Sequence, residues 1–240
     1  MSRENRARDY VTMAREYGLL GVALTCLLAG PGRADEAVVP VTNAAFHLFT
    51  FQDENMSLEK VTLPAGASTG YHSHDQDLVF VITAGAKITN QVLGQQPAEL
   101  EFKRGEVRFA PYTKKPGVHR ITNLEKADAL RLLAVGIVYP ESRNYAVSTR
   151  PAKYELALDN ERIRAWRLKL EPGESAPVIR QTAPGARFVV TGGKAVEKRP
   201  DKLDQPMVLQ ADDFTVMPME ERSIQNAGSN SIELVEIELK

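Results

Sequence analysis

The chain contains 240 residues, of which 43% are hydrophobic and 25% are charged, as is typical of a globular protein that buries a core. Its 30 basic and 31 acidic residues give a formal net charge of -1, and the basic residues are scattered along the chain. This balance excludes the electrostatic footprint of a nucleic-acid-binding protein, so we expect no nucleic-acid partner.

The first predicted element is a signal peptide over residues 1–34. Its apolar core, Leu19 to Ala29, follows several arginines and is too short to span a bilayer as a helix. Small residues up to Ala34 suit cleavage there, and Met13 is an alternative start. A buried helix or an uncleaved anchor are the other interpretations. We expect a periplasmic or secreted protein, without membrane attachment after cleavage and without Cys26, its only cysteine.

An internal repeat organises the rest of the chain. The segment from Val61 to His74 resembles that from Leu168 to Gln181, and Gly66 falls on Gly173 at an offset of 107 residues. The same offset aligns three more turn positions: Gly85 with Gly192, Gly105 with Asp212, and Pro111 with Pro218. We therefore predict two domains of one fold, 35–145 and 146–240, with a boundary near Asn144 to Lys153.

The segments between the turns are short and typical of β-strands, and no helical period of useful length follows the signal segment. The clearest predicted strands are Leu78–Thr83, Ala129–Val138, Arg187–Thr191, Phe214–Met217 and Ile232–Leu239. Many short strands at close spacing predict an all-β chain in which each half is a sandwich or barrel.

The hydrophobic alternation slips by one residue at the same place in both halves. In the first half the apolar positions move from Met56 and Leu58 to Val61 and Leu63. The second half repeats the slip before Leu168. A one-residue slip is what a β-bulge produces, so we predict a bulge in both copies.

Three of the four histidines are candidates for a metal site. His72 and His74 are two residues apart, so on a strand both imidazoles project from one face. His119 is the candidate third ligand from a neighbouring strand, since three imidazoles can hold a divalent cation. His47 fits no such pattern and is interpreted as incidental.

These residues resemble the two motifs of the cupin superfamily. The first motif matches at Gly66, His72, His74 and Gly85. The second matches at Gly105, Pro111, His119 and Asn123, with about four extra residues within Tyr112 to Gly117. The resemblance covers both halves and implies a bicupin: two tandem jelly-roll barrels, also described as double-stranded β-helices. It also implies one divalent metal ion, Fe, Mn or Zn, in the first barrel.

One motif position departs from the family. Leu78 stands where cupins carry a glutamate ligand, and Asp75 or Asp77 could replace it only through a bulge. The resemblance then implies a site of three neutral histidines, as in some iron-dependent dioxygenases of the superfamily. Such a metal keeps its full charge and several open positions, which favours an anionic or chelating small molecule.

The second half lacks these ligands. Ile179 and Gln181 replace the His-x-His pair, and Arg222 replaces the third histidine, so we expect no metal there. Arg222 has two interpretations. It could hold an anionic group together with Gln181, or it could pair with Glu220 or Glu221 at the surface, which we favour.

Two functions remain. The chain is a metal-dependent enzyme, for which we favour a dioxygenase acting on a small oxygen-bearing organic molecule, or it is a non-catalytic binding protein, sensor or scaffold. No acid or base can be named near the histidines, so no catalytic residue is assigned. The candidate substrate-binding residues are Leu78, Phe80, Phe109 and Arg222. Cupin relatives also suggest a homodimer formed through exposed strands.

Overall fold

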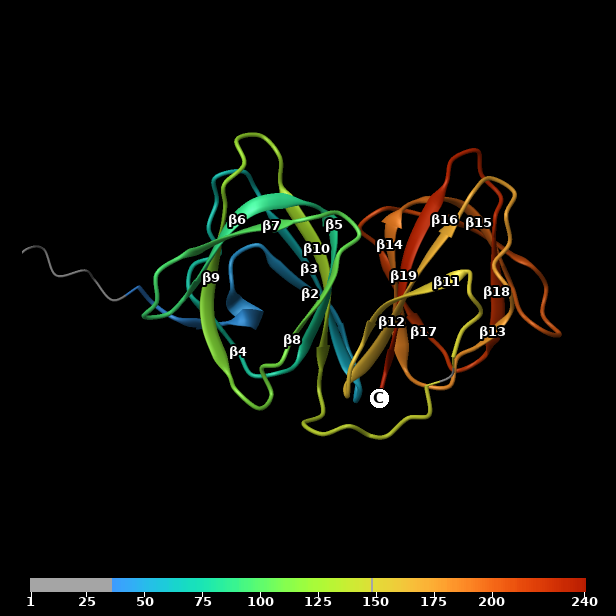
Figure 1. The fold of residues 1–240 in the computed structure, drawn as a ribbon, viewed down its shortest axis with the longest axis horizontal. Coiled ribbons are helices and arrows are strands. Elements are labelled where there is room, and N and C mark those ends of the chain that lie inside the picture. Colours follow the sequence, from blue (N-terminus) through green and yellow to red (C-terminus); the bar gives the residue numbers. More distant parts are fainter. Residues whose placement is uncertain (1–35, 148) are drawn as a thin grey trace, which may run out of the picture. The chain divides into compact units, whose positions relative to one another are not determined.

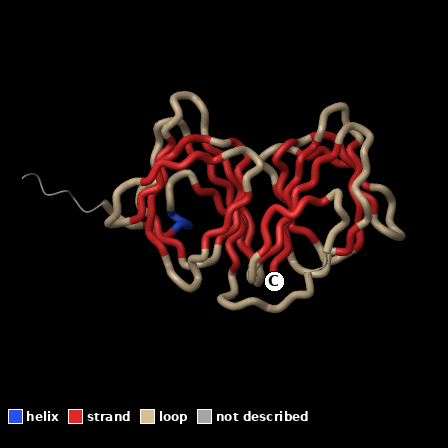
Figure 2. The backbone as a smooth tube through the Cα atoms, viewed as in Figure 1, coloured by secondary structure: helices blue, strands red, loops and turns tan. Residues whose placement is uncertain are grey.

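Nineteen strands and one short 3-10 helix form the part of the chain that the computed structural model describes, residues 36–147 and 149–240 (Figures 1 and 2). The predicted signal peptide over residues 1–34 lies outside these residues. Within them, no helix has the length and apolar character needed to cross a membrane.

The first barrel consists of two five-stranded sheets, ordered β1-β4-β9-β6-β7 and β2-β3-β10-β5-β8. Its elements are β1 (Val39–Pro40), η1 (Val41–Asn43), β2 (His47–Gln52), β3 (Met56–Leu63), β4 (His72–His74), β5 (Leu78–Ala84), β6 (Ala86–Val92), β7 (Ala98–Phe102), β8 (Val107–Ala110), β9 (Gly117–Asn123) and β10 (Leu130–Ile137).

The second barrel repeats this arrangement with sheets ordered β11-β12-β19-β14-β17 and β13-β18-β15-β16. Its elements are β11 (Tyr154–Asp159), β12 (Ile163–Leu170), β13 (Ile179–Arg180), β14 (Gly185–Thr191), β15 (Gly193–Lys198), β16 (Gln205–Leu209), β17 (Phe214–Met217), β18 (Glu221–Asn226) and β19 (Ile232–Leu239). The predicted all-β fold of two tandem barrels is confirmed, and the five predicted strands correspond to β5, β10, β14, β17 and β19.

The repeated glycines have the same structural roles in both barrels. Gly66 and Gly173 have φ angles of 70° and 79°, a backbone conformation that side chains disfavour. A Cβ atom on Gly85 would lie 2.3 Å from the carbonyl oxygen of Phe102, and one on Gly192 would lie equally close to a carbonyl oxygen of its own barrel. Each pair therefore marks a turn or close approach that needs glycine.

The motif asparagine Asn123 also has a structural role that recurs. Its Nδ2 donates hydrogen bonds to the carbonyl oxygens of Leu63 and Asp128, at 3.0 and 2.9 Å. In the second barrel, Asn226 donates to the carbonyl oxygen of Leu170 at 2.9 Å and to a carbonyl oxygen four residues further along. Both asparagines thus stabilise, through hydrogen bonds, the turn that precedes the last strand of their barrel.

The predicted β-bulge lies beside the phase slip, in the neighbouring strand. The register of β2 against β3 shifts between Phe49 and Phe51, opposite Glu59 and Leu58. The register of β11 against β12 shifts at the equivalent place, between Leu156 and Leu158. The strand that carries the slip has no extra residue. β3 pairs with β10 residue for residue from Met56 to Leu63, without a shift in register. Met56 and Leu58 point to one face and Val61 and Leu63 to the other, and both faces are buried. At the slip, the apolar side chains of β3 therefore change from one face of the strand to the other. Glu59 lies on the same face as Val61.

The two barrels share a hydrophobic core. The outer faces of the sheets that contain β3 and β12 meet there, so the residues that the slip sends outward in both halves are buried against each other. The core includes Met56, Leu58, Val79, Val81, Leu133, Val135 and Ile137 of the first barrel, and Ile163, Ala165, Phe188, Val190, Val235, Ile237 and Leu239 of the second. This core unites residues 36–240 into one unit.

Candidate metal centre

Two neighbouring strands bring three histidines together in the first barrel. His72 and His74 lie on β4, and His119 lies on β9 directly opposite His72 in the antiparallel register. Each of the three residues offers one ring nitrogen as a ligand, and these nitrogens all lie within 4.8 Å of one another. The arrangement supplies three donor atoms around one point, as a metal ion requires.

Hydrogen bonds orient two of these rings. The Nδ1 atom of His72 donates to the carbonyl oxygen of Gly70 at 3.1 Å, and the Nδ1 atom of His119 donates to Oδ1 of Asn90 at 2.8 Å. Each bond places the ring proton on Nδ1, so the lone pair of Nε2 is free for a cation.

The environment keeps the three histidines neutral. Burial lowers the pKa of His72 to about 4, of His119 to about 3 and of His74 to about 2. For His74 and His119 the neighbouring histidines lower the pKa further, because two imidazolium ions cannot lie so close together. Near neutral pH the rings therefore do not need to lose a proton before they bind a metal.

The extra residues of the second motif place a tyrosine against the site. The ring of Tyr112 stacks on His74 with centroids 4.8 Å apart and an angle of 12° between the planes. A Cβ atom on Gly117 would lie 2.7 Å from Cε1 of Tyr112, so glycine is needed for this approach. The insertion thus packs an aromatic ring against the imidazole of His74.

His47, interpreted as incidental, lies beside the three histidines without joining their group of ligand atoms. The centroid of its ring lies 4.9 Å from that of His72, and the residue lines the same cavity. Its Nδ1 donates to the carbonyl oxygen of Ala45 at 2.9 Å. Only the pairing of β2 with β3, which sets His47 opposite Val61, brings it here, and no sequence spacing encodes that pairing.

The histidines open into a cavity of about 210 Å³ inside the first barrel. The predicted substrate-binding residues Leu78, Phe80 and Phe109 all line it, with Phe102 and other apolar side chains. Arg108 and Asn90 add polar groups, although Arg108 is held by Glu106 with Nη2 and Oε1 2.7 Å apart. The cavity suits a small molecule with an apolar part and a few polar atoms.

The cavity also contains a carboxyl group that sequence reasoning missed. Glu59 on β3 lines it and is only 3% exposed. Burial raises the pKa of Glu59 to about 7. The one available signal was its position between Leu58 and Val61, where the phase slip turns it inward. A titratable carboxyl group therefore lines the same cavity as the histidines.

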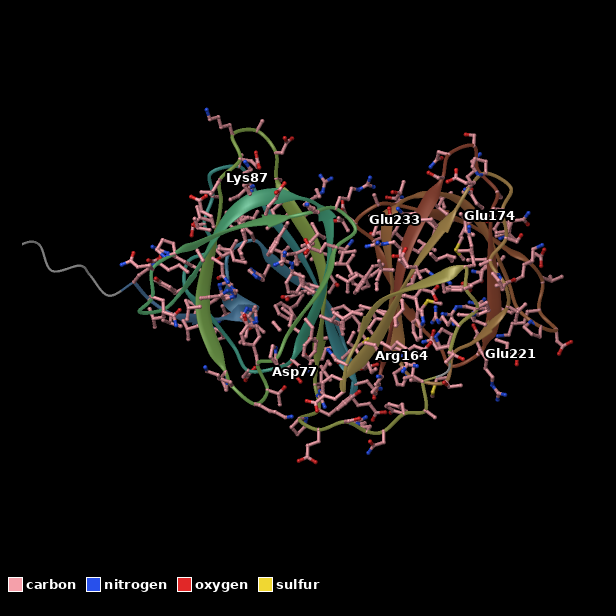
Figure 3. The ribbon with its side chains drawn as sticks, viewed as in Figure 1. Asp77, Lys87, Arg164, Glu174, Glu221 and Glu233 are labelled. Carbon is pink, nitrogen blue, oxygen red and sulfur yellow. The ribbon has the colours of Figure 1, made fainter. Side chains whose placement is uncertain are left out.

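Asp75 and Asp77 do not replace the missing motif glutamate. Asp75 is exposed, and Asp77 is committed to another partner. Its Oδ2 lies 2.8 Å from Nε of Arg162 in a buried ion pair, and its Oδ1 accepts a hydrogen bond from the backbone of Thr113 at 2.9 Å. Figure 3 labels Asp77 on the side of the first barrel that faces the second. Neither residue joins the three histidines.

The favoured surface interpretation of Arg222 is wrong. Arg222 is 1% exposed, and it lies opposite Ile179 on β13 just as His119 lies opposite His72. Its Nη2 donates to Oε1 of Gln181 at 2.6 Å and to Oε2 of Glu236 at 3.1 Å. Glu221, labelled in Figure 3, lies on the outer side of this barrel. The anionic group that Arg222 contacts is thus the protein's own carboxylate, and Gln181 contacts the guanidinium and not that carboxylate.

A buried ion network occupies the inside of the second barrel. Arg187, Arg222 and Arg150 all contact Glu236, and Arg187 also lies 2.7 Å from Glu197. Burial alone would raise the pKa of Glu236, but the guanidinium groups of these three arginines hold it well below its ordinary value. Protein charges therefore fill the region where the first barrel keeps its histidines.

No protein family matches the sequence, and no curated protein is significantly similar to it in sequence. Solved structures are similar in fold. AerE from Microcystis aeruginosa has a TM-score of 0.58 at 10% identity, over 82% of this chain and 98% of that chain. A cupin 2 conserved barrel domain protein from Leptotrichia buccalis has a TM-score of 0.50 at 11% identity, over 81% of this chain and 88% of that chain.

A third similar structure is a metalloprotein. The oxalate decarboxylase of Bacillus subtilis, which has Mn(II) centres, has a TM-score of 0.54 at 14% identity, over 78% of this chain and 69% of that chain. At these identities the similarity shows the fold alone.

Proposed function

We propose that this chain, which has the cupin fold, binds one divalent metal ion through His72, His74 and His119 and uses it on a small oxygen-bearing molecule. The observation that carries the proposal is the convergence of three buried, neutral imidazoles whose ligand atoms lie within 4.8 Å of one another. Two of them present Nε2 because Nδ1 is already bonded to an oxygen. This donor set fits Fe, Mn or Zn.

The cavity indicates what the metal would act on. A bound divalent ion would supply Lewis acidity and, if it is Fe or Mn, redox chemistry with dioxygen. Leu78, Phe80 and Phe109 would exclude water, and the three neutral ligands leave the positive charge of the ion uncompensated. These features support an anionic or chelating organic ligand. Oxalate, on which the Bacillus subtilis protein of similar fold acts, is a ligand of this kind.

Within this class we favour a metal-dependent dioxygenase. The buried site and its apolar surroundings would protect a redox metal, and the carboxyl group of Glu59 supplies an acid or base in the same cavity. The alternative is a non-catalytic binding protein, sensor or scaffold. The second barrel supports that alternative, because its ion network leaves it with no comparable site among the described residues.

Metal content tests the proposal directly. The full chain, purified and dialysed, should contain about one Fe or Mn per molecule, and His72→Ala and His119→Ala should lose it. A variant of the second barrel, Gln181→Ala, is the matched control and should keep the metal. Wild type that stays free of metal after exposure to Fe, Mn and Zn salts would exclude the metal site. Stoichiometric zinc without oxygen consumption would favour the non-catalytic alternative.

We also propose that the protein is exported and that residues 1–34 are removed. The support is the sequence pattern alone. Mass spectrometry of the protein from the periplasm or medium of an expressing cell should find a chain beginning at Asp35. A chain that retains Leu19 to Ala29 in the cytoplasm would contradict export.

A further inference from the structure

One carboxyl group of the first barrel is buried and incompletely paired. The Oε2 atom of Glu59 has no hydrogen-bond partner among the described residues. The residues opposite Glu59 on the two neighbouring strands are Phe49 and Ala134, and neither side chain can pair with it. A buried polar atom without a partner costs free energy, so its presence calls for a functional explanation.

Glu59 lies between two hollows of the molecule. It lines the cavity of about 210 Å³ that contains the histidines, and it also lines a smaller pocket of about 90 Å³. His74 and Leu78 line both spaces as well, so these residues form a shared wall. The smaller pocket is bordered by the exposed residues Gln52 and Asp75 and therefore leads toward solvent.

The second barrel lacks this carboxyl group. At the repeat offset of 107 residues, Glu59 corresponds to Trp166, which is buried and packs on the guanidinium of Arg150 at 4.0 Å. The barrel that lost its histidines therefore also lacks the acid. The fold itself does not require a carboxyl group at this position of the strand.

We propose that Glu59 is the acid–base residue of this site and exchanges a proton between a ligand at the three histidines and solvent through the smaller pocket. The ligand class is a small molecule with an acidic hydroxyl group, such as a phenol, an enol or a hydroxy acid. When that oxygen enters the three-histidine site, its O–H bond breaks and the proton goes to Oε2 of Glu59. The inference rests on the proposed metal site.

The charges around Glu59 agree with this role. The titratable side chains that face the cavity are His47, His72, His74, His119, Arg108 and Tyr112, and Asp75 borders the smaller pocket. The four histidines are neutral near pH 7, and Arg108 is paired with Glu106. Because burial brings the pKa of Glu59 to about 7, it can both accept and release a proton at neutral pH.

Proton release on ligand binding tests the assignment. The full chain is loaded with Co(II), its metal content is measured, and catechol is titrated by calorimetry at pH 8 in buffers with different heats of ionisation. Wild type should release about one proton fewer per catechol than Glu59→Gln, because a proton held in a hydrogen bond between Glu59 and the bound catecholate oxygen stays in the complex. Glu59→Gln should also bind catechol roughly tenfold more weakly, and Glu59→Asp should recover part of both effects.

The controls separate this role from a structural one. Glu99→Gln, the same change at an exposed position, should behave as wild type. Azide carries no proton at pH 8, so its binding should be equal in all variants. Equal proton release by wild type and Glu59→Gln, with metal in both, overturns the role of Glu59 and leaves the metal site intact. Loss of metal from Glu59→Gln would make Glu59 a ligand and also overturn it. A wild type without metal overturns both proposals.

Discussion

At the scale of single residues, the centre depends on groups that hold the histidines as much as on the histidines themselves. Asn90 fixes the ring of His119, and Gly70, with a φ angle of 69°, presents its carbonyl oxygen to His72. Such partners orient a ligand and set its tautomer before a metal arrives. They also lie outside the motifs that identify the ligands.

Asn90 provides the first prediction. Asn90→Leu keeps the size of the side chain but removes the acceptor for Nδ1 of His119, so the ring can turn or change tautomer. We expect metal affinity to fall about 10- to 100-fold. Competition with a coloured chelator measures it. Gln91→Leu, which removes the neighbouring amide on the same strand, is the control, and an equal loss in both variants would contradict the prediction.

Glu59 provides the second prediction, on the metal-free protein. Its pKa is about 7 in the folded chain and about 4.5 when unfolded, so the folded state binds more protons between these pH values. The contribution of Glu59 to stability therefore falls as the pH rises from about 4.5 to about 7, by about 3 kcal/mol.

Urea denaturation in EDTA at pH 5 and pH 8 measures this effect. Glu59→Gln should gain stability relative to wild type at pH 8 by more than at pH 5, because glutamine carries no charge to bury. Glu99→Gln should show no such difference. A pH-independent gap between Glu59→Gln and wild type would mean that Glu59 keeps its ordinary pKa in the folded chain.

At the scale of elements, the second barrel shows what replaces the three histidines. Arg222 takes the position of His119 in the strand pairing, and the carboxylate of Glu236 pairs with the guanidinium of Arg222. Buried charges of this kind contribute little net stability as a set, but removing one member leaves the others uncompensated.

Glu236 therefore provides the third prediction. Glu236→Gln should lower the free energy of unfolding by about 3–5 kcal/mol, since three arginines then lose their shared carboxylate. Urea denaturation followed by circular dichroism measures the change. Glu221→Gln, an exposed glutamate on β18, is the control and should cost less than about 0.5 kcal/mol. Similar losses in both variants would refute a special role for the network.

The elements also show why sequence reasoning succeeded in part. The five predicted strands are rich in apolar residues that lie in or against the cores, whereas β6 and β16 are partly exposed and carry no clear alternation. The phase slip is real, but the bulge that accompanies it lies in the neighbouring strand, β2 or β11. The strand that carries the slip is buried on both faces, and this burial depends on how the barrels pack, which the sequence of one strand cannot reveal.

The residues of the site were predicted from the sequence only where they fall on a motif. His72, His74 and His119 were identified because a strand spacing and two motifs select them. His47 and Glu59 were missed because they join the cavity through sheet pairing between β2 and β3, far from either motif. Arg222 was misplaced because local acidic neighbours, Glu220 and Glu221, suggested a surface pair, whereas its partner Glu236 lies on β19.

At the scale of the whole molecule, the shared core predicts that the barrels unfold together. Trp166 is the only tryptophan and lies in the second barrel, so its fluorescence reports that barrel. Leu63→Ala, deep in the first barrel, should lower the midpoint of the Trp166 transition, with a loss of about 2–5 kcal/mol.

Leu203→Ala, at a position 94% exposed, is the control and should leave the midpoint unchanged. The fluorescence and circular dichroism curves should coincide in both variants. In the contrary case, Leu63→Ala would leave the midpoint of the Trp166 fluorescence transition unchanged, while circular dichroism would show an additional transition at lower urea concentration. That result would mean that the two barrels fold independently.

Joining two such barrels through their outer sheet faces has one more consequence. The pair resembles a dimer whose subunits are tied by a peptide linker, so dilution cannot separate them and each always finds its neighbour at high effective concentration. The sheet faces that would otherwise recruit another copy are already covered. Self-association of this protein must therefore use other surfaces, and the second barrel, which lacks the three histidines, still covers the apolar side of the first.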